Sequence, residues 1–146
     1  LCATLTCISH PFGYEIELRD PTLQEALEFL ESDQTDKHHY REEEYTCVNF
    51  AKDFRNSALK SGYRCGYVIV YFPATGHLKD MIDRPSTITI WSHALNCFNT
   101  TNYGPIYVEP QTDEIVALTR GQPYWDRTKY FQPVYNDTIV DYRIFW

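Results

Sequence analysis

Apolar residues recur at helical spacing in an early stretch of the chain. The apolar positions are Leu23, Ala26, Leu27 and Leu30. Asp20 and Pro21 precede them, and this pair is typical of a helix N-cap followed by its first residue. A polar run from Ser32 interrupts the pattern. We therefore predict a helix over Pro21–Glu31, followed by a polar loop up to Glu44.

A second set of apolar residues indicates another helix. Its members share one helical face at i, i+4, i+7 and i+11, and they are Cys47, Ala51, Phe54 and Ala58. Gly62 is placed to end this helix as its C′ residue. The pattern puts Cys47 in the first turn of a helix that packs on the core.

The rest of the chain has the character of strands. Runs rich in Val, Ile, Tyr and Phe, bounded by Pro, Gly and Asn, cover Tyr63–Phe72, Thr87–Asn99, Pro105–Glu109, Glu114–Leu118 and Thr138–Phe145. Helices followed by neighbouring strands indicate one α+β domain over 1–146 with an antiparallel sheet. We expect Pro73–Pro85 to form a surface loop or lid, and the aromatic stretch Arg120–Pro133 to pack across the sheet.

Composition narrows the range of partners. Hydrophobic residues make up 43% of the chain and charged residues 23%, which is globular, and the net charge of −7 argues against nucleic acid or an anionic membrane as partner. Leu1–Ile8 is too short to span a bilayer, so no direct membrane insertion is expected of this chain. We interpret residues 1–19 as an N-terminal segment, the stub of a removed signal or anchor. With the sequons at Asn99 and Asn136, it favours an extracellular or cell-envelope location.

The cysteines do not form a framework that sequence alone can define. There are five, an odd number, without the spacing of a zinc ribbon. Cys65 and Cys97 fall in apolar strand runs, so we expect buried, unreactive thiols. No cofactor or metal is expected, and a site built from His93, Cys97 and Cys47 is the metal alternative.

Cys47 is the candidate nucleophile. The positive end of a helix dipole and its free N–H groups stabilise a thiolate at a helix start. His93 opens an apolar strand segment that can carry it to this helix start as the base. Glu109 ends the next strand and is the candidate that orients the histidine, with Asp113 and Glu114 as alternatives.

The order of these residues resembles transglutaminase-like domains. The matching pieces are Tyr45-Thr46-Cys47-Val48-Asn49-Phe50-Ala51, Gly62-Tyr63-Arg64-Cys65-Gly66-Tyr67-Val68, Ser92-His93-Ala94-Leu95-Asn96 and Tyr107-Val108-Glu109-Pro110. The resemblance implies a papain/transglutaminase-like fold, with a catalytic helix packed on an antiparallel sheet. The third residue is usually aspartate in that family and is glutamate here. The Cys47 N–H is the default oxyanion donor, assisted by Tyr45 or Asn49.

The resemblance implies a thiol protease or transglutaminase-like hydrolase. A peptide or protein substrate would be attacked by Cys47 to form a thioester, which passes to water or to an amine. Hydrolysis of the peptidase type is favoured because the sequence shows no second groove for an amine. The alternative is a catalytically inactive binding or scaffold module of the cell envelope.

Overall fold

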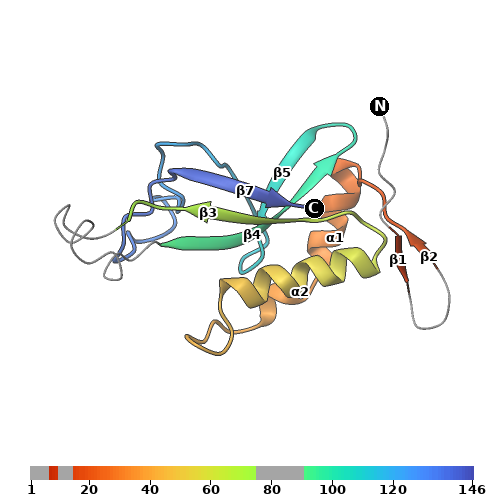
Figure 1. Cartoon of the computed structure of the whole chain (residues 1–146), viewed down its shortest axis with the longest axis horizontal. Coiled ribbons are helices and arrows are strands. Elements are labelled where there is room, and N and C mark those ends of the chain that lie inside the picture. Colours follow the sequence, from red (N-terminus) through yellow and green to blue (C-terminus); the bar gives the residue numbers. More distant parts are fainter. Residues whose placement is uncertain (1–6, 10–14, 75–90) are drawn as a thin grey trace, which may run out of the picture.

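A five-stranded antiparallel sheet forms the centre of the computed structural model, which describes residues 7–9, 15–74 and 91–146. The strand order is β6-β5-β4-β3-β7, and β1 and β2 pair in a separate two-stranded sheet (Figure 1). In chain order the elements are β1 (Cys7–Ser9), β2 (Glu15–Glu17), α1 (Leu23–Ser32), a 3-10 turn η1 (Thr35–Lys37), α2 (Cys47–Lys60), β3 (Gly66–Tyr71), β4 (Ser92–Thr100), β5 (Gly104–Glu109), β6 (Glu114–Val116) and β7 (Asp141–Phe145).

The start of α1 lies two residues later than the sequence pattern predicted. Thr22 is the N-cap: its side chain accepts a hydrogen bond from the backbone N–H of Glu25, and the Glu25 carboxylate accepts from the Thr22 N–H at 2.8 Å. This reciprocal capping box satisfies two N–H groups that the helix itself cannot pair. The predicted cap, Asp20, instead forms an ion pair with Arg64 at 3.0 Å.

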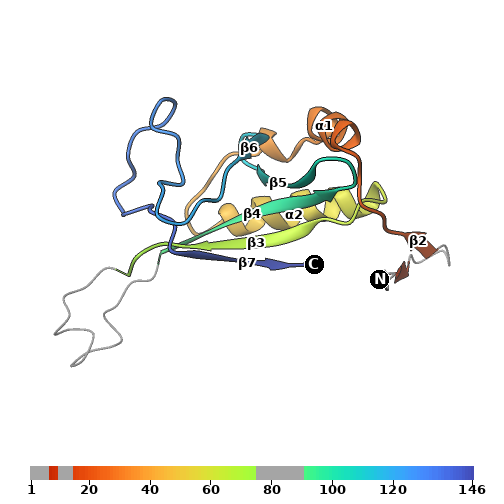
Figure 2. The same cartoon turned by 90° about the horizontal axis from the view of Figure 1, so that it is seen from above.

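The second helix holds Cys47 at its first position. Its N-cap is Thr46, whose backbone N–H donates to the side-chain oxygen of Asn49 at 3.0 Å. The helix ends at Lys60, and Gly62 follows with φ of +82°, a conformation that favours glycine. The helix therefore has defined ends, and α2 runs along one face of the sheet (Figure 2).

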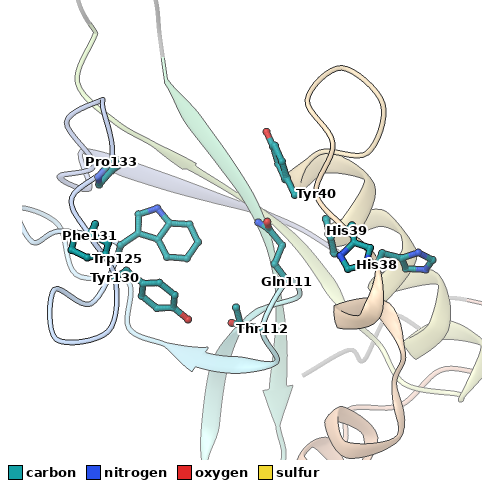
Figure 3. Close-up of a pocket in the computed structure, with 10 residues that line it drawn as sticks. His38, His39, Tyr40, Gln111, Thr112, Trp125, Tyr130, Phe131 and Pro133 are labelled. Carbon is teal, nitrogen blue, oxygen red and sulfur yellow. The ribbon is translucent and has the colours of Figure 1, made fainter.

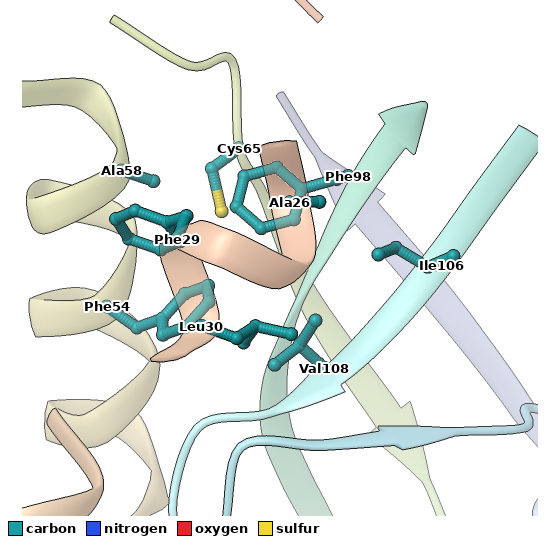
Figure 4. Close-up of a cluster of buried hydrophobic side chains, with 9 residues drawn as sticks. All are labelled: Ala26, Phe29, Leu30, Phe54, Ala58, Cys65, Phe98, Ile106 and Val108. Atoms are coloured by element: carbon teal, nitrogen blue, oxygen red, sulfur yellow. The ribbon is translucent and has the colours of Figure 1, made fainter. Parts of the chain in front are cut away.

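The helix side of the sheet is an apolar cluster (Figure 4). Phe29 of α1 meets Phe54 of α2 and Phe98 of β4 edge to face, with ring centroids 5.3 and 5.8 Å apart. Ile106 and Val108 of β5 close the cluster. Edge-to-face contacts of this kind add to the free energy gained by burying the rings, so this face fixes both helices on the sheet.

The opposite side of the sheet is covered by the chain between β6 and β7. Tyr124 and Ile139 from this stretch pack with Val70, Leu95 and Cys97 of the sheet. Figure 2 shows the stretch leaving the sheet beyond β6 and returning to β7. The aromatic stretch expected to pack across the sheet thus contributes Tyr124 to this second cluster.

The fold class inferred from the sequence requires a correction. In place of the papain/transglutaminase-like class, the structure has a five-stranded, fully antiparallel sheet with two helices, in which the last strand, β7, pairs with β3. The assignment was made from short motifs around three side chains, and such motifs do not determine the order of strands. The expected lid Pro73–Pro85 lies mostly outside the described residues, as do Cys2 and the first residues of the strand expected from Thr87.

Candidate functional site

The site lies where β4 extends beyond its pairing with β5. The register of β4 and β5 ends at Asn96 opposite Val108, whereas β4 begins at Ser92. Residues 92–95 are therefore paired with β3 on one side only. The backbone N–H of Ala94 lies in this stretch and helps to lower the pKa of the Cys47 thiol. The free edge of β4 thus meets the start of α2.

His93 and Glu109 form a buried pair in this gap. The Nε2 atom of His93 lies 2.6 Å from Oε2 of Glu109, and the two residues are 6% and 0% exposed. The same Oε2 atom accepts a hydrogen bond of 2.5 Å from the hydroxyl of Tyr124. The other carboxylate oxygen, Oε1, accepts from the backbone N–H and the side-chain amide of Gln111, each at 3.2 Å. Glu109 therefore has a partner for both oxygens, as a buried carboxylate requires.

Cys47 is half-buried and lies close enough to His93 for the histidine to lower the pKa of its thiol. Because Nε2 of His93 faces Glu109, Nδ1 is the ring nitrogen left for the thiol. Burial opposes ionisation of Cys47, but the hydrogen bond and charge of His93 outweigh it and lower the pKa of the thiol. Burial likewise opposes protonation of His93, but the Glu109 charge and the Cys47 hydrogen bond raise its pKa to about 10.

These pKa shifts favour one protonation state of the site. Burial acts to raise the pKa of Glu109, but the charge of His93 prevails and lowers it, so the carboxylate stays ionised. All three shifts act in the direction of an imidazolium between a thiolate and a carboxylate. Such a thiolate is a nucleophile near neutral pH, and its neighbouring imidazolium can protonate a leaving group.

The two side chains expected to assist at an oxyanion have other partners. Tyr45 donates its hydroxyl to Asp53 at 2.7 Å and packs edge to face on Phe50. The side-chain oxygen of Asn49 accepts from Thr46 at the helix start. Their assignment stays a prediction without a supporting contact, and the Cys47 N–H is the remaining donor of those proposed.

The alternative orienting acids also lie elsewhere. Glu114 binds Lys129 at 3.0 Å and the hydroxyl of Tyr130 at 3.1 Å. Asp113 faces the carboxylates of Asp33 and Asp36; burial and these two charges raise its pKa to about 7. Of the three acids considered, Glu109 is the one with a contact to His93.

Three residues of the site were not identified from the sequence. Tyr124 and Gln111 hold the Glu109 carboxylate, and Trp125 packs on His93 with ring centroids 5.4 Å apart. The aromatic composition of Arg120–Pro133 was the available signal, but nothing local to it indicates which ring reaches the site. Gln111 follows Glu109 by two residues and gave no signal of its own.

A groove of about 410 Å³ opens beside the site (Figure 3). Trp125 and Tyr130 lie on one wall, Tyr40 and His39 on the other, and Gln111 between them. The complete lining is His38, His39, Tyr40, Phe50, Gln111, Thr112, Trp125, Tyr130, Phe131 and Pro133. Because Trp125 also packs on His93 and Gln111 binds Glu109, the groove and the site share two side chains.

The other cysteines of the strands have a different setting. Cys65 and Cys97 are 1% and 0% exposed. Burial raises the pKa of both thiols, that of Cys97 to about 12. Within the described residues, no group of three His, Cys, Asp or Glu side chains is arranged to hold a metal ion. The predicted lack of reactivity of Cys65 and Cys97 can be tested in the same alkylation experiment as Cys47.

The chain has a partial likeness to solved structures. No family model and no curated protein match the chain. One similar solved structure is a Polyporus squamosus lectin bound to a human-type influenza-binding epitope, with 17% identity and a TM-score of 0.47 over 73% of this chain and 36% of that chain. Another is described as a complex of PSL1a with E64, with 16% identity and a TM-score of 0.47 over 68% and 35%. The chain spans about a third of the length of these solved proteins.

The enzyme class inferred from the sequence requires a correction as well. The first similar structure is named a lectin, and neither is named a papain-like or transglutaminase-like protein. The class of thiol protease or transglutaminase-like hydrolase is therefore withdrawn, together with the cysteine-protease and papain-like descriptions. It rested on motifs of a few residues, which define local chemistry and not a family. In the described ranges, no helix is long and apolar enough to cross a membrane.

Proposed function

We propose that Cys47 is a nucleophilic thiol that accepts an acyl group as a thioester, with His93 as its proton donor and acceptor and Glu109 as the residue that orients His93. The observation that carries the proposal is the buried contact of 2.6 Å between His93 and Glu109, beside a thiol whose pKa His93 lowers. A thiol, an imidazole and a carboxylate in this order constitute an activated nucleophile.

The proposed reaction begins from the thiolate and the imidazolium. The Cys47 sulfur attacks the carbonyl carbon of the acyl donor, and the carbonyl π electrons move to its oxygen. When the tetrahedral adduct collapses, the bond to the leaving amine or alcohol breaks, and His93 protonates that group. A thioester and a neutral imidazole remain. Water or an amine then attacks the thioester, and His93 accepts a proton from this second nucleophile. The acyl group passes to the water oxygen or the amine nitrogen, and the Cys47 thiolate is released.

The groove provides the place for the acyl donor. Its walls carry the rings of Trp125 and Tyr130, and the Gln111 amide lies between the walls. Aromatic walls favour an apolar or aromatic substituent. The polar groups between such walls orient the ligand by hydrogen bonds. We therefore propose a peptide or protein amide with such a side chain as the acyl donor.

Selective alkylation tests the nucleophile. Iodoacetamide at about pH 6 should label Cys47 well before Cys65 and Cys97, because its pKa is lowered and theirs are raised, so Cys47 has the larger thiolate fraction. His93→Ala should slow the labelling of Cys47 and leave the other two unchanged, with Cys47→Ser as the blank. Equal labelling of all three cysteines in the native protein would overturn the proposal.

A binding module is the second candidate function. It is favoured by one observation, which is that Tyr45 and Asn49 have partners away from the thiol and leave no assigned side chain for an oxyanion. In that case the groove binds its ligand and no acyl transfer follows. A peptide with an electrophilic carbonyl separates the two candidates: mass spectrometry should show an adduct on Cys47 for the nucleophile, whereas a module would bind the peptide equally in Cys47→Ala and form no adduct.

A further inference from the structure

We infer that Tyr124 is a positioning residue for the site, whose hydroxyl holds the Glu109 carboxylate so that the shared proton stays on His93. This inference rests on the proposed role of Cys47, and it adds a residue from the segment between β6 and β7. It is carried by the geometry around one atom: Oε2 of Glu109 lies 2.5 Å from the Tyr124 hydroxyl and 2.6 Å from Nε2 of His93.

Two donors on one carboxylate oxygen determine where the proton lies. Each hydrogen bond to a carboxylate stabilises its ionised form and makes it a weaker base. Gln111 adds two donors on the other oxygen, at 3.2 Å each. With the Tyr124 hydroxyl present, the charged pair of imidazolium and carboxylate is favoured over a pair in which His93 has lost its proton to Glu109. The thiolate needs that imidazolium as its neighbour.

The Tyr124 hydroxyl is buried, so a water molecule is not available to take its place on Glu109. Tyr124 is 5% exposed and Glu109 is 0% exposed, so water does not reach the bond between them. The Tyr124 ring packs on His93 with centroids 4.9 Å apart and on Phe72 at 6.1 Å. Loss of the hydroxyl would leave the Glu109 oxygen with one partner fewer in a buried place, which is costly for a charged acceptor.

The segment that carries Tyr124 is itself fixed to the fold. The backbone N–H of Tyr124 donates to the carbonyl oxygen of Asp137 at 2.9 Å. The backbone N–H of Trp125 donates to the Asp137 carboxylate at 3.0 Å. Asp137 is 2% exposed and forms an ion pair with Arg127. The hydroxyl is therefore held in position before any ligand binds, which is what a positioning residue requires.

The test is the pH dependence of Cys47 alkylation in the full chain, compared between wild type, Tyr124→Phe and Tyr142→Phe. Tyr124→Phe removes one oxygen and keeps the ring, and it should move the half-maximal rate on the acidic side upward by about half to one pH unit, because a hydrogen bond of about 1 kcal/mol corresponds to that shift. Tyr142→Phe is the matched control: its hydroxyl accepts from the Tyr107 hydroxyl at 3.5 Å, and its loss should leave the profile unchanged.

The outcomes separate this inference from the proposed function. If wild-type Cys47 titrates like an ordinary thiol, the proposed function fails and the inference fails with it. If the wild-type profile is shifted to low pH and Tyr124→Phe matches it, the inference alone is overturned. Long-range ¹H–¹⁵N spectra of the His93 ring provide a second reading, because Tyr124→Phe should move its nitrogen shifts toward the neutral form while a purely structural role would not.

Discussion

The two faces of the central sheet bury different kinds of side chains. On the helix face, Phe29, Phe54 and Phe98 meet in an apolar cluster that contains no charged side chain. On the opposite face, Leu95 and Cys97 continue into a region where His93 and Glu109 are buried together. The strands contribute to both faces because successive side chains alternate across a sheet.

The two kinds of burial differ in what they contribute to the free energy of folding. Burying apolar rings is the main source of folding free energy, whereas burying an ion pair is costly unless every lone pair and proton has a partner. The second face meets that condition through Tyr124 and Gln111, which satisfy Glu109. The helix face is thus apolar, whereas the opposite face combines the apolar cluster around Leu95 with the buried pair of His93 and Glu109.

The largest expected effect lies on the apolar face. Phe54→Ala removes a ring that is 0% exposed and in contact with Phe29 and Phe98, so the free energy of unfolding should fall by about 3–5 kcal/mol. Urea unfolding followed by circular dichroism measures it. Val48→Ala on the same helix, at a position 53% exposed, should change the value by less than about 0.5 kcal/mol. Similar losses in both variants would contradict the assignment of Phe54 to the core.

Changes to the pair of His93 and Glu109 should affect the titration of His93 more than the stability of the fold. Glu109→Gln removes the charge that raises the pKa of His93 to about 10, so that pKa should fall by on the order of one to three pH units. Because the pKa is raised in the folded protein, protonated His93 stabilises the fold fully below its ordinary 6.5, and this is lost as the pH rises through about 10. The loss should begin at lower pH in the variant.

Titration of the His93 ring by NMR checks this expectation. Glu114→Gln is the matched control, because Glu114 binds Lys129 and Tyr130 and makes no contact with His93 in the described structure. An unchanged His93 titration in Glu109→Gln, or a shift of equal size in the control, would show that the pair does not set the protonation of the histidine.

The smallest expected effect concerns a carboxyl at the border of the apolar face. Burial and the charges of Asp33 and Asp36 raise the pKa of Asp113 from 3.8 to about 7, so ionised Asp113 destabilises the fold above that pH and not below 3.8. Asp113→Asn should therefore raise the melting temperature by roughly 2–4 °C at mildly alkaline pH and leave it unchanged in acid. Asn also suits the φ of +56° at this position.

Thermal melts at the two pH values make the test, with Glu42→Gln as control. Glu42 is exposed, so its replacement should have little effect at either pH. A gain for Asp113→Asn that is equal in acid and in alkali would exclude the carboxyl charge as its cause.

Local patterns in the sequence explain much of the fold, though not its class. The spacing of Ala51, Phe54 and Ala58 predicted a helix that carries Cys47 at its start, and α2 begins at Cys47. Apolar spacing did not identify the start of α1, because the choice of Thr22 over Asp20 depends on the ion pair that Asp20 makes with a distant residue, Arg64. The class was wrong because strand order depends on long-range pairing, such as that of β7 with β3.

The site divides in the same way. The order of elements led us to expect Cys47, His93 and Glu109 near one another, and the structure brings them together, while their chemical role stays a prediction. Tyr124 could not be found, because it reaches Glu109 only through the route of the chain across the sheet. Sequence patterns identify side chains that lie on regular elements, and they miss those delivered by irregular segments.

The position of β7 has a consequence for the order in which the chain becomes reactive. Synthesis produces Cys47 before Tyr124 and Asp137, and β7 (Asp141–Phe145) can pair with β3 only after all three exist. Contacts between residues far apart in sequence form slowly and late in folding. Under the proposed function, Cys47 is therefore held in its full set of contacts only after Tyr124 has joined the sheet.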